Sequence, residues 1–172
     1  MVTLTPFFWY TVSVKQHDGS YTTQNELFIE TDPREIYDVL VDFNRRHLWW
    51  KTNRAELLNG EKVQEGSRVI IRARHRIFPV RFLMRIEKLE PPRLIRLGVE
   101  EGPIQGHCEW QIESEKRGAL VRLVWKGVRP RGLLGRWMFA LSGEQKHRQH
   151  AAHGLEGLKA YLLSSPPRKR TA

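Results

Sequence analysis

The alternation of apolar and polar residues follows two different periods along this 172-residue chain. Across residues 67–126 the period is close to two, which is typical of strands with one face buried. Short polar connections separate these runs, so we expect antiparallel neighbours in one sheet. An earlier pair, 7–15 and 21–30, is joined by the turn signal His17-Asp18-Gly19-Ser20 and predicts a hairpin. The later strands are expected at 69–75, 80–89, 95–100, 104–113 and 121–126.

A helical period replaces this alternation in residues 142–163, where an apolar stripe recurs every three to four positions. We predict a helix capped by Ser142, with Gln145 as the partner residue of a capping box. Residues 133–141 begin the helical region, either as a separate segment or continuous with this helix. The stripe needs an apolar surface to cover it, and the sheet is the available one. Its residues are Glu144, Ala151, Leu155, Leu158 and Leu162.

A shorter helix is predicted directly after the hairpin. Asp32 fits the N-cap position, Pro33 the first helical position and Glu35 the third. The apolar positions of this helix end near residue 41, and residues 45–50 form one further helical turn that carries two tryptophans. Leu57 and Leu58 belong to a short strand.

Composition and length favour a single domain over residues 1–163. Residues 1–19 are an N-terminal extension or an extra strand, and residues 164–172 are expected to be a disordered basic tail. No apolar run approaches the roughly 20 residues of a membrane span, and no signal peptide is recognisable. The one cysteine, Cys108, excludes an internal disulfide, and a cytoplasmic location is the expectation.

The charge balance points to anionic partners. Lys and Arg total 29 against 19 Asp and Glu, a formal net charge of +10. Such a surplus favours nucleic acid, acidic lipid head groups or acidic proteins. Alternatively, it reflects only the coding composition of the genome.

Several local features resemble those of one superfamily, in the same order along the chain. They are residues 26–33 running into 36–40, the pair Asp42-Phe43 followed by Trp49-Trp50, Gly66 before a strand, the corner at 90–94, Gly106 with Trp110, and the closing residues 155–159. Together they resemble the START-like (SRPBCC) helix-grip superfamily over about residues 21–163. That superfamily includes polyketide cyclase/dehydrase-type proteins and the birch-pollen-allergen group.

The resemblance implies an α+β helix-grip fold: a curved antiparallel sheet wrapped around a long C-terminal helix, with two short helices after the first family strand. Members include lipid carriers, hormone receptors, cyclases, coenzyme Q-binding proteins and ribosome-association toxins, and they share no catalytic motif. The resemblance therefore implies a hydrophobic ligand, with a cyclase or dehydratase activity as one option. We expect no cofactor.

If the terminal helix packs on the inward side of the sheet, the inward strand positions line an apolar, aromatic space suited to a hydrophobic small molecule. The alternative is that the same side chains simply form the core. Phe43, Trp49 and Trp50 are expected at the mouth of the pocket. The full set of candidate ligand-binding residues is Phe43, Trp49, Trp50, Ile71, His75, Phe82, Met84, Leu97, Cys108, Trp110, Leu123, Trp125 and Leu155.

Candidates for chemistry are few. His75 is the ionisable side chain that the alternation places inward, so it is the candidate general base, with a solvent-facing hairpin position as the alternative. Cys108 and His107 are adjacent in a strand and point to opposite faces, so they cannot form a nucleophile–base pair. In a helix, His147 and His153 lie about 120° apart. Metal ligands usually share one helix face, so we expect no metal site.

A basic patch is predicted on the outer side of the sheet, where Arg72, Arg74, Arg81 and Arg85 come together on neighbouring strands. Clustered guanidinium groups bind phosphates bidentately. Arg96, Arg122 and Lys126 extend the patch, unless Glu87, Glu109 and Glu113 pair with them.

Three hypotheses follow. The first is binding of a lipid, isoprenoid or polyketide-like aromatic between sheet and helix. The second is a cyclase or dehydratase that uses the same cavity. The third is an interaction protein that docks RNA or an acidic membrane through its basic face. A monomer and a homodimer are both compatible with the sequence.

Overall fold

The computed structural model of the chain describes residues 10–60, 62–74 and 79–164. These residues form an eight-stranded antiparallel sheet in the order β1-β2-β8-β7-β6-β5-β4-β3. The strands are β1 (Tyr10–Lys15), β2 (Tyr21–Ile29), β3 (Asn53–Leu57), β4 (Arg68–Arg74), β5 (Pro79–Glu90), β6 (Leu94–Glu101), β7 (Ile104–Glu115) and β8 (Gly118–Pro130).

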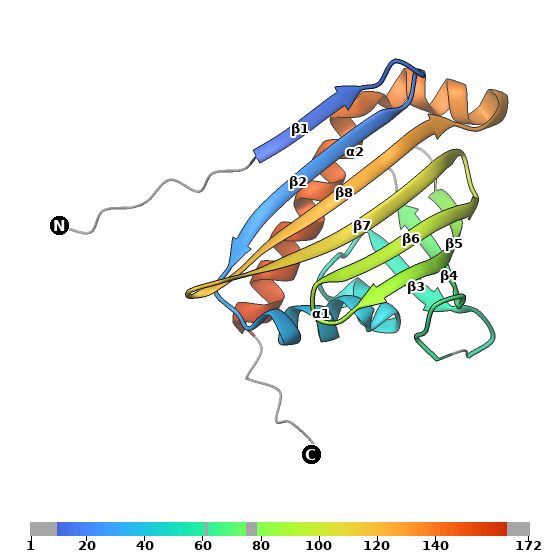
Figure 1. Cartoon of the computed structure of the whole chain (residues 1–172). Coiled ribbons are helices and arrows are strands. Elements are labelled where there is room, and N and C mark those ends of the chain that lie inside the picture. The colour runs from blue at the N-terminus through green and yellow to red at the C-terminus, as the bar shows by residue number, and fades with distance from the viewer. Residues whose placement is uncertain (1–9, 61, 75–78, 165–172) are drawn as a thin grey trace.

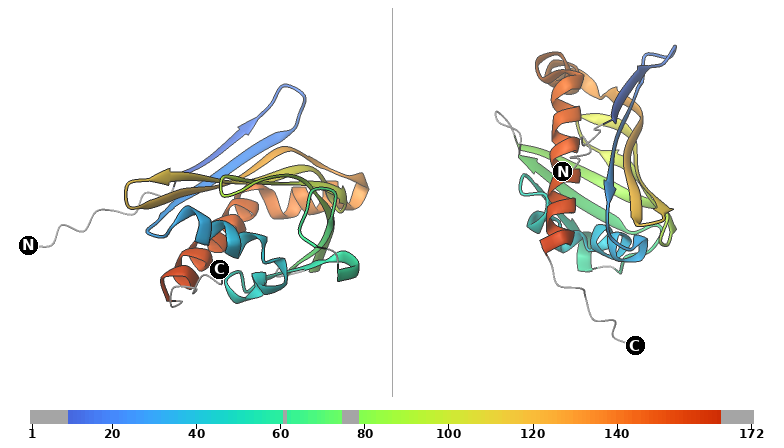
Figure 2. Two further views of the ribbon diagram at one scale, coloured as in Figure 1. Left: turned by 60° about the horizontal axis from the view of Figure 1, so that its bottom comes forward. Right: turned by 90° about the vertical axis from the view of Figure 1, so that its left-hand side faces the viewer.

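The long helix α2 (Gly132–Ser164) lies against the concave side of this curved sheet (Figures 1 and 2). Four residues of the predicted stripe, Ala151, Leu155, Leu158 and Leu162, are buried there. The predicted α+β helix-grip fold is therefore confirmed. No helix among the described residues is long and apolar enough to cross a membrane.

The predicted N-cap at Ser142 is wrong, and of the two alternatives for residues 133–141 the structure shows the continuous helix. Ser142 lies inside α2, which begins at Gly132 and is continuous through residues 133–141. Gly132 has a φ of 65°, which turns the chain from β8 into the helix. The residues that follow contain no proline, and an internal glycine costs a helix only about 1 kcal/mol. The side chain of Glu144 lies outside the described part of the chain.

The two predicted short helices are present between β2 and β3. In α1 (Pro33–Val41), Asp32 is the N-cap and its Oδ1 accepts a hydrogen bond from the Arg34 backbone N–H at 2.8 Å, as expected. The 3₁₀ helix η1 (Phe43–Leu48) follows and carries the chain toward Trp49 and Trp50. A second 3₁₀ turn, η2 (Leu58–Gly60), begins at Leu58, so the short strand ends one residue earlier than predicted.

The predicted N-terminal hairpin is observed for its described residues, since β1 pairs along the edge of β2. The Gln16 backbone N–H donates to the Ser20 carbonyl at 2.8 Å, and Gly19 has a φ of 78°. β8 continues to Pro130, beyond the predicted end at residue 126. The pairing resumes past this point because Gly127 has a φ of 63° and because the register shifts between Gln105 and His107 of β7.

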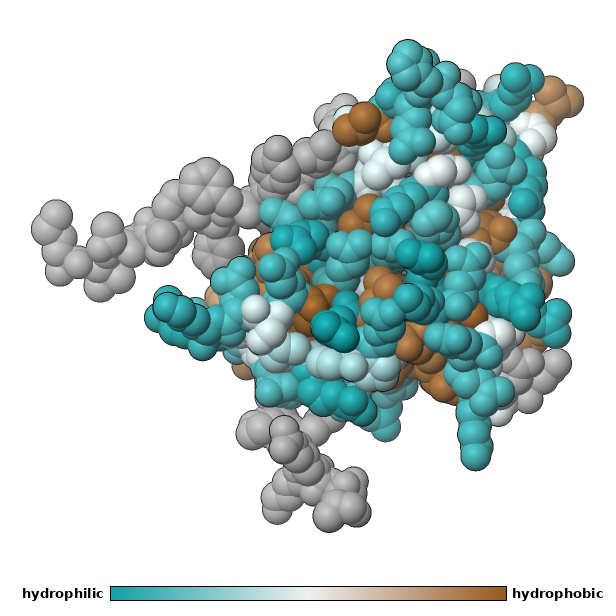
Figure 3. Space-filling model, in the orientation of Figure 1, coloured by the Kyte–Doolittle hydropathy of each residue, from teal (hydrophilic) through white to brown (hydrophobic). Residues whose placement is uncertain are grey.

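The core lies between the concave face of the sheet, α1, η1 and the second half of α2. The opposite, convex face is largely hydrophilic (Figure 3). The side chains at the end of the core near α1, which we call the closed end, are completely buried. They include Ile29, Ile36, Ile86, Ile95 and Val121, each with no exposed surface.

Candidate functional site

Three tryptophans form the centre of the interior. Trp49 and Trp50 follow η1, and Trp110 points inward from β7. The ring centroids of Trp49 and Trp110 are 6.0 Å apart at 84°, and those of Trp50 and Trp110 are 6.2 Å apart at 88°. Edge-to-face contacts of this kind fix the relative position of aromatic rings. The segment after η1 is thereby held against the sheet.

The helix α2 approaches this segment through two glycines. A Cβ at Gly154 would lie 2.7 Å from the indole ring of Trp50, and one at Gly157 would overlap the Trp49 carbonyl oxygen. The imidazole of His150, one turn earlier, lies 5.0 Å from the Trp50 ring. This side chain is half-buried against the aromatic ring.

The candidate lining residues that the structure describes all join one apolar cluster. Phe43, Trp49 and Trp50 are buried within it, and their predicted position at a pocket mouth stays a prediction. His75 lies outside the described residues. The other members of the cluster are Ile71, Met84, Leu97, Cys108, Trp110, Leu123 and Leu155, which are buried, and Phe82 and Trp125, which pack against it with part of their surface exposed.

Burial falls along the concave face from one end of the sheet to the other. Near α1 the inward residues are completely buried. Toward the start of α2, the inward residues Phe82 of β5, Val99 of β6 and Trp125 of β8 are only half-buried. The part of the interior with accessible apolar surface therefore lies beside the first half of α2.

Arg46 of η1 is a charged residue within this apolar interior, and the sequence analysis did not single it out. It is 3% exposed, and its Nε and Nη2 atoms have no hydrogen-bond partner. Its guanidinium carbon lies 5.2 Å from the centroid of the Phe43 ring and 5.8 Å from that of Trp49. Burial lowers the pKa of the Arg46 guanidinium to about 10, which leaves it cationic at neutral pH.

Cys108 is a buried thiol on the inner face, and His107 is on the outer face with Nε2 3.7 Å from the Glu109 carboxylate. The prediction that the two side chains cannot meet is confirmed. Burial raises the pKa of Cys108 to about 12, so the thiol is protonated at neutral pH. It packs as a residue of the core.

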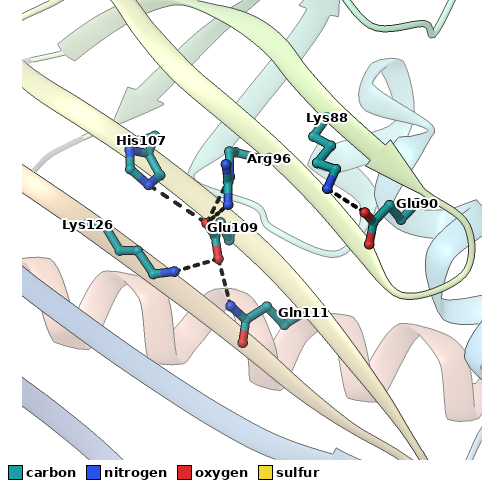
Figure 4. Close-up of polar contacts among 7 residues, drawn as sticks. All are labelled: Lys88, Glu90, Arg96, His107, Glu109, Gln111 and Lys126. Carbon is teal, nitrogen blue, oxygen red and sulfur yellow. Dashed lines mark hydrogen bonds and ion pairs between the residues drawn. The ribbon is translucent and has the colours of Figure 1, made fainter.

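On the outer face, Glu109 forms a buried centre of ion pairs (Figure 4). Its carboxylate accepts from Arg96 at 2.7 Å, Lys126 at 3.0 Å and Gln111 at 2.7 Å. Arg122 pairs in the same way with Glu26 and Glu113. The predicted extension of the basic patch by Arg96, Arg122 and Lys126 is thus neutralised by acidic partners, which is the alternative that the sequence left open.

The four arginines of the predicted patch are exposed, and strand pairing places some of them directly opposite other arginines. Arg72 of β4 lies directly opposite Arg81 of β5 and Arg54 of β3, which the sequence analysis did not include. Arg85 lies opposite Arg68, and Arg74 opposite Pro79. Within the described residues, the acidic side chain paired with this row is Glu56, which contacts Arg72 at 2.7 Å. We call Arg54, Arg72 and Arg81 the arginine row.

Within the part of the chain that the structure describes, no cluster of His, Cys, Asp or Glu could hold a metal ion. Asp38 pairs with Arg34 at 3.2 Å and Asp42 with Arg45 at 3.7 Å. An open groove of about 490 Å³ runs past the start of α1 and the β5–β6 turn, outside the core.

Comparisons with known proteins support the fold. No family model and no curated protein matches the sequence. Among solved structures, the protein TTHA0849 from Thermus thermophilus has a TM-score of 0.70 at 21% identity, over 84% of this chain and 99% of that one. Major latex-like protein 151 from Panax ginseng has a TM-score of 0.65 at 12% identity, over 82% and 96%. Ara h 8.0201 has a TM-score of 0.64 at 13% identity, over 86% and 100%. At these identities the likeness shows a shared fold alone.

Proposed function

We propose that this chain is a member of the START-like superfamily that binds a hydrophobic or amphipathic small molecule between the concave face of the sheet and α2. A lipid, an isoprenoid or a polyketide-like aromatic fits this environment. The observation that carries the proposal is the fall in burial along the concave face, which leaves Phe82, Val99 and Trp125 half-buried while they face inward.

These three side chains are apolar or aromatic and come from three different strands. A ligand that covers their remaining exposed surface would gain about 25 cal/mol for each Å² of apolar area removed from water. The rigid tryptophan cluster and the fully buried closed end form the floor against which such a ligand rests. Specific polar contacts are then needed only to orient it.

The test is binding of 1-aminoanthracene, an uncharged apolar fluorophore, followed by its fluorescence increase. Filling the accessible end with Val99→Trp should weaken binding at least about tenfold, since the indole takes the space of the probe. Val14→Trp is the matched control, because Val14 is 53% exposed on β1. Absence of binding by the unmodified protein, or equal affinity in the two variants, would remove the proposal.

A cyclase or dehydratase is a second candidate, and the placement of His150 favours it. The imidazole of His150 is half-buried against the Trp50 ring, and histidine is the side chain that most often serves as general acid or base. If the protein catalyses such a reaction, His150→Gln should abolish turnover and leave 1-aminoanthracene binding within twofold. Turnover that survives this substitution would exclude His150 as the catalytic group.

A further inference from the structure

We propose that the ligand of this interior is an amphipathic carboxylic acid, whose carboxylate is bound by Arg46. The inference rests on the proposed function, since it names the chemical class of the molecule held at that site. It starts from an unusual feature of the core, namely a buried cation to which no acidic partner is paired among the residues that the structure describes.

The buried charge of Arg46 is energetically unfavourable. Its side chain is 3% exposed, yet Nε and Nη2 donate to no acceptor, and no ion pair joins it to an acidic residue in the described part of the chain. A buried ion that lacks a partner is strongly unfavourable. The contrast with Glu109 is direct, because that buried carboxylate has Arg96, Lys126 and Gln111 around it.

The rings around Arg46 supply only part of what it lacks. Phe43 and Trp49 lie at cation–π distance from the guanidinium. Such contacts offset some of the charge but leave the Nε and Nη2 donors without acceptors. Asn53 Oδ1, at the start of β3, is itself buried without a donor, so the two groups are not joined.

Further donors lie in the same segment. Trp49 Nε1 and Trp50 Nε1 are buried and also without hydrogen-bond partners. Buried indole N–H groups usually have an acceptor. Within five consecutive residues, 46–50, the chain therefore presents Nε and Nη2 of Arg46 and two indole N–H groups that lack acceptors. Such a set of donors fits a ligand rich in acceptors, such as a carboxylate.

The guanidinium also lies on the correct side of the sheet. Its carbon lies 5.8 Å from the Trp49 ring, and that ring lies 6.0 Å from Trp110, which is on the inner face of β7 together with Cys108. Cys108 lies directly opposite Trp125 of β8, one of the half-buried residues at the accessible end. A ligand with its acid at Arg46 would thus extend its apolar part along the same face toward Trp125.

The number of charges limits the acid to one negative charge. Among the described residues, the buried charged side chains are Arg46 and Glu109, and Glu109 is on the outer face. One guanidinium neutralises a carboxylate and binds both of its oxygens in a planar pair. A phosphate dianion would keep an unbalanced charge in the apolar interior.

The test compares cis-parinaric acid with its methyl ester, which have the same apolar chain. Binding of each is followed by energy transfer from tryptophan to the probe. The unmodified protein should bind the acid roughly tenfold to hundredfold more tightly than the ester, the range expected for a hydrogen-bonded charged group. Arg46→Met should abolish this ratio by weakening acid binding, with ester affinity unchanged within twofold.

A control variant and the pattern of acid and ester binding separate this inference from the proposed function. Arg45→Met is the matched control, because Arg45 is the exposed neighbour on η1, and it should keep the ratio. Equal affinity for acid and ester in the unmodified protein, or an equal loss of both in Arg46→Met, overturns the assignment of Arg46 while the proposed function stands. Binding of neither probe overturns the proposed function and this inference together.

Discussion

At the scale of single residues, two buried ionisable groups lie on opposite faces of the sheet and differ in their partners. Arg46 is in the apolar interior without an acidic partner among the described residues, whereas Glu109 is on the outer face among several donors. Arg46 has hydrogen-bond donors that a ligand could satisfy, whereas the carboxylate of Glu109 is already satisfied by its protein partners. The proposed ligand site and this centre of ion pairs therefore lie on different faces of the sheet.

Glu109 should make stability depend on pH. Its burial alone would raise the pKa of the carboxyl, but hydrogen bonds from Lys126 and Gln111 and the charges of Lys126 and Arg96 outweigh burial and lower this pKa. The stabilising contribution is therefore complete above the unfolded pKa near 4.5, and it is lost as the pH falls through the lower folded pKa.

Replacing Glu109 by Gln should lower the free energy of unfolding by about 1–3 kcal/mol at pH 7, because Arg96 and Lys126 lose their carboxylate. These cations are 37% and 41% exposed, so water relieves part of the loss. Urea denaturation from pH 3 to 7 measures the effect, and the difference from the unmodified protein should shrink at the acid end. Glu113→Gln, at an exposed pair, should cost under about 1 kcal/mol. A difference for Glu109→Gln that does not vary with pH would contradict this account.

The importance of Arg46 and His150 was not recognised in the sequence, for different reasons. Phe43, Arg46 and Trp49 recur every three residues, which places them on one face of a 3₁₀ helix. That spacing is a usable signal, but an arginine next to Arg45 in a basic chain is most simply interpreted as a surface residue. For His150, the close approach of α2 at Gly154 decides burial, and helix periodicity does not encode such an approach.

At the scale of elements, α2 and the segment after η1 are held together by the absence of side chains at Gly154 and Gly157. Gly157→Ala places a Cβ against the Trp49 carbonyl oxygen, a backbone atom that cannot rotate away. Because the overlapped atom belongs to the backbone, the cost of overpacking is at the upper end of its usual range, about 2–3 kcal/mol, and it exceeds the roughly 1 kcal/mol that alanine gains in a helix.

The free energy of unfolding of Gly157→Ala, measured in urea, should therefore fall by about 1–2 kcal/mol. Glu156→Ala is the control, since Glu156 is exposed on the adjacent position of α2 and should change stability by less than about 0.5 kcal/mol. A Gly157→Ala protein as stable as the control would mean that α2 does not depend on this close approach.

Most elements could be predicted from the sequence because each has a local cause. Alternation identifies the strands from 67 onward, and Asp32 with Pro33 marks the start of α1. The helical region is expected from residue 133, but Ser142 offers a good local cap that suggests a separate start. Only the turn at Gly132 in the structure shows that the two parts are one continuous helix. The continuation of β8 past residue 126 depends on Gly127 and on its partner strand, and neither effect is local in the sequence.

At the scale of the whole molecule, the chain has a net charge of +10, and acidic partners neutralise its cations unevenly on the outer face of the sheet. Arg96, Arg122 and Lys126 have acidic partners, while the arginine row across β3, β4 and β5 has Glu56 alone among the described residues. Like charges directly opposite one another destabilise a sheet. The row is therefore the part of this surface that supports docking on an anionic partner, which remains a candidate function.

The variant Arg81→Gln tests both the repulsion within the arginine row and the role of the row in docking. Relief of repulsion from Arg72 should raise the free energy of unfolding by roughly 0.2–1 kcal/mol, with a larger effect at low salt. Binding to vesicles with anionic lipid, or to RNA, should weaken in the same variant if the row docks on either. Arg117→Gln, in the exposed β7–β8 turn, should change neither quantity. Anion binding equal in both variants would remove the row as a docking surface.

Native mass spectrometry of the purified chain, followed by solvent extraction, shows whether a small molecule occupies the interior. We expect an additional mass of one small molecule on the 20.3 kDa chain, released on unfolding as an apolar compound that carries one carboxylate. A bare chain mass, together with no binding of cis-parinaric acid or its methyl ester, would contradict the account. The arginine row would then be the surface on which function depends.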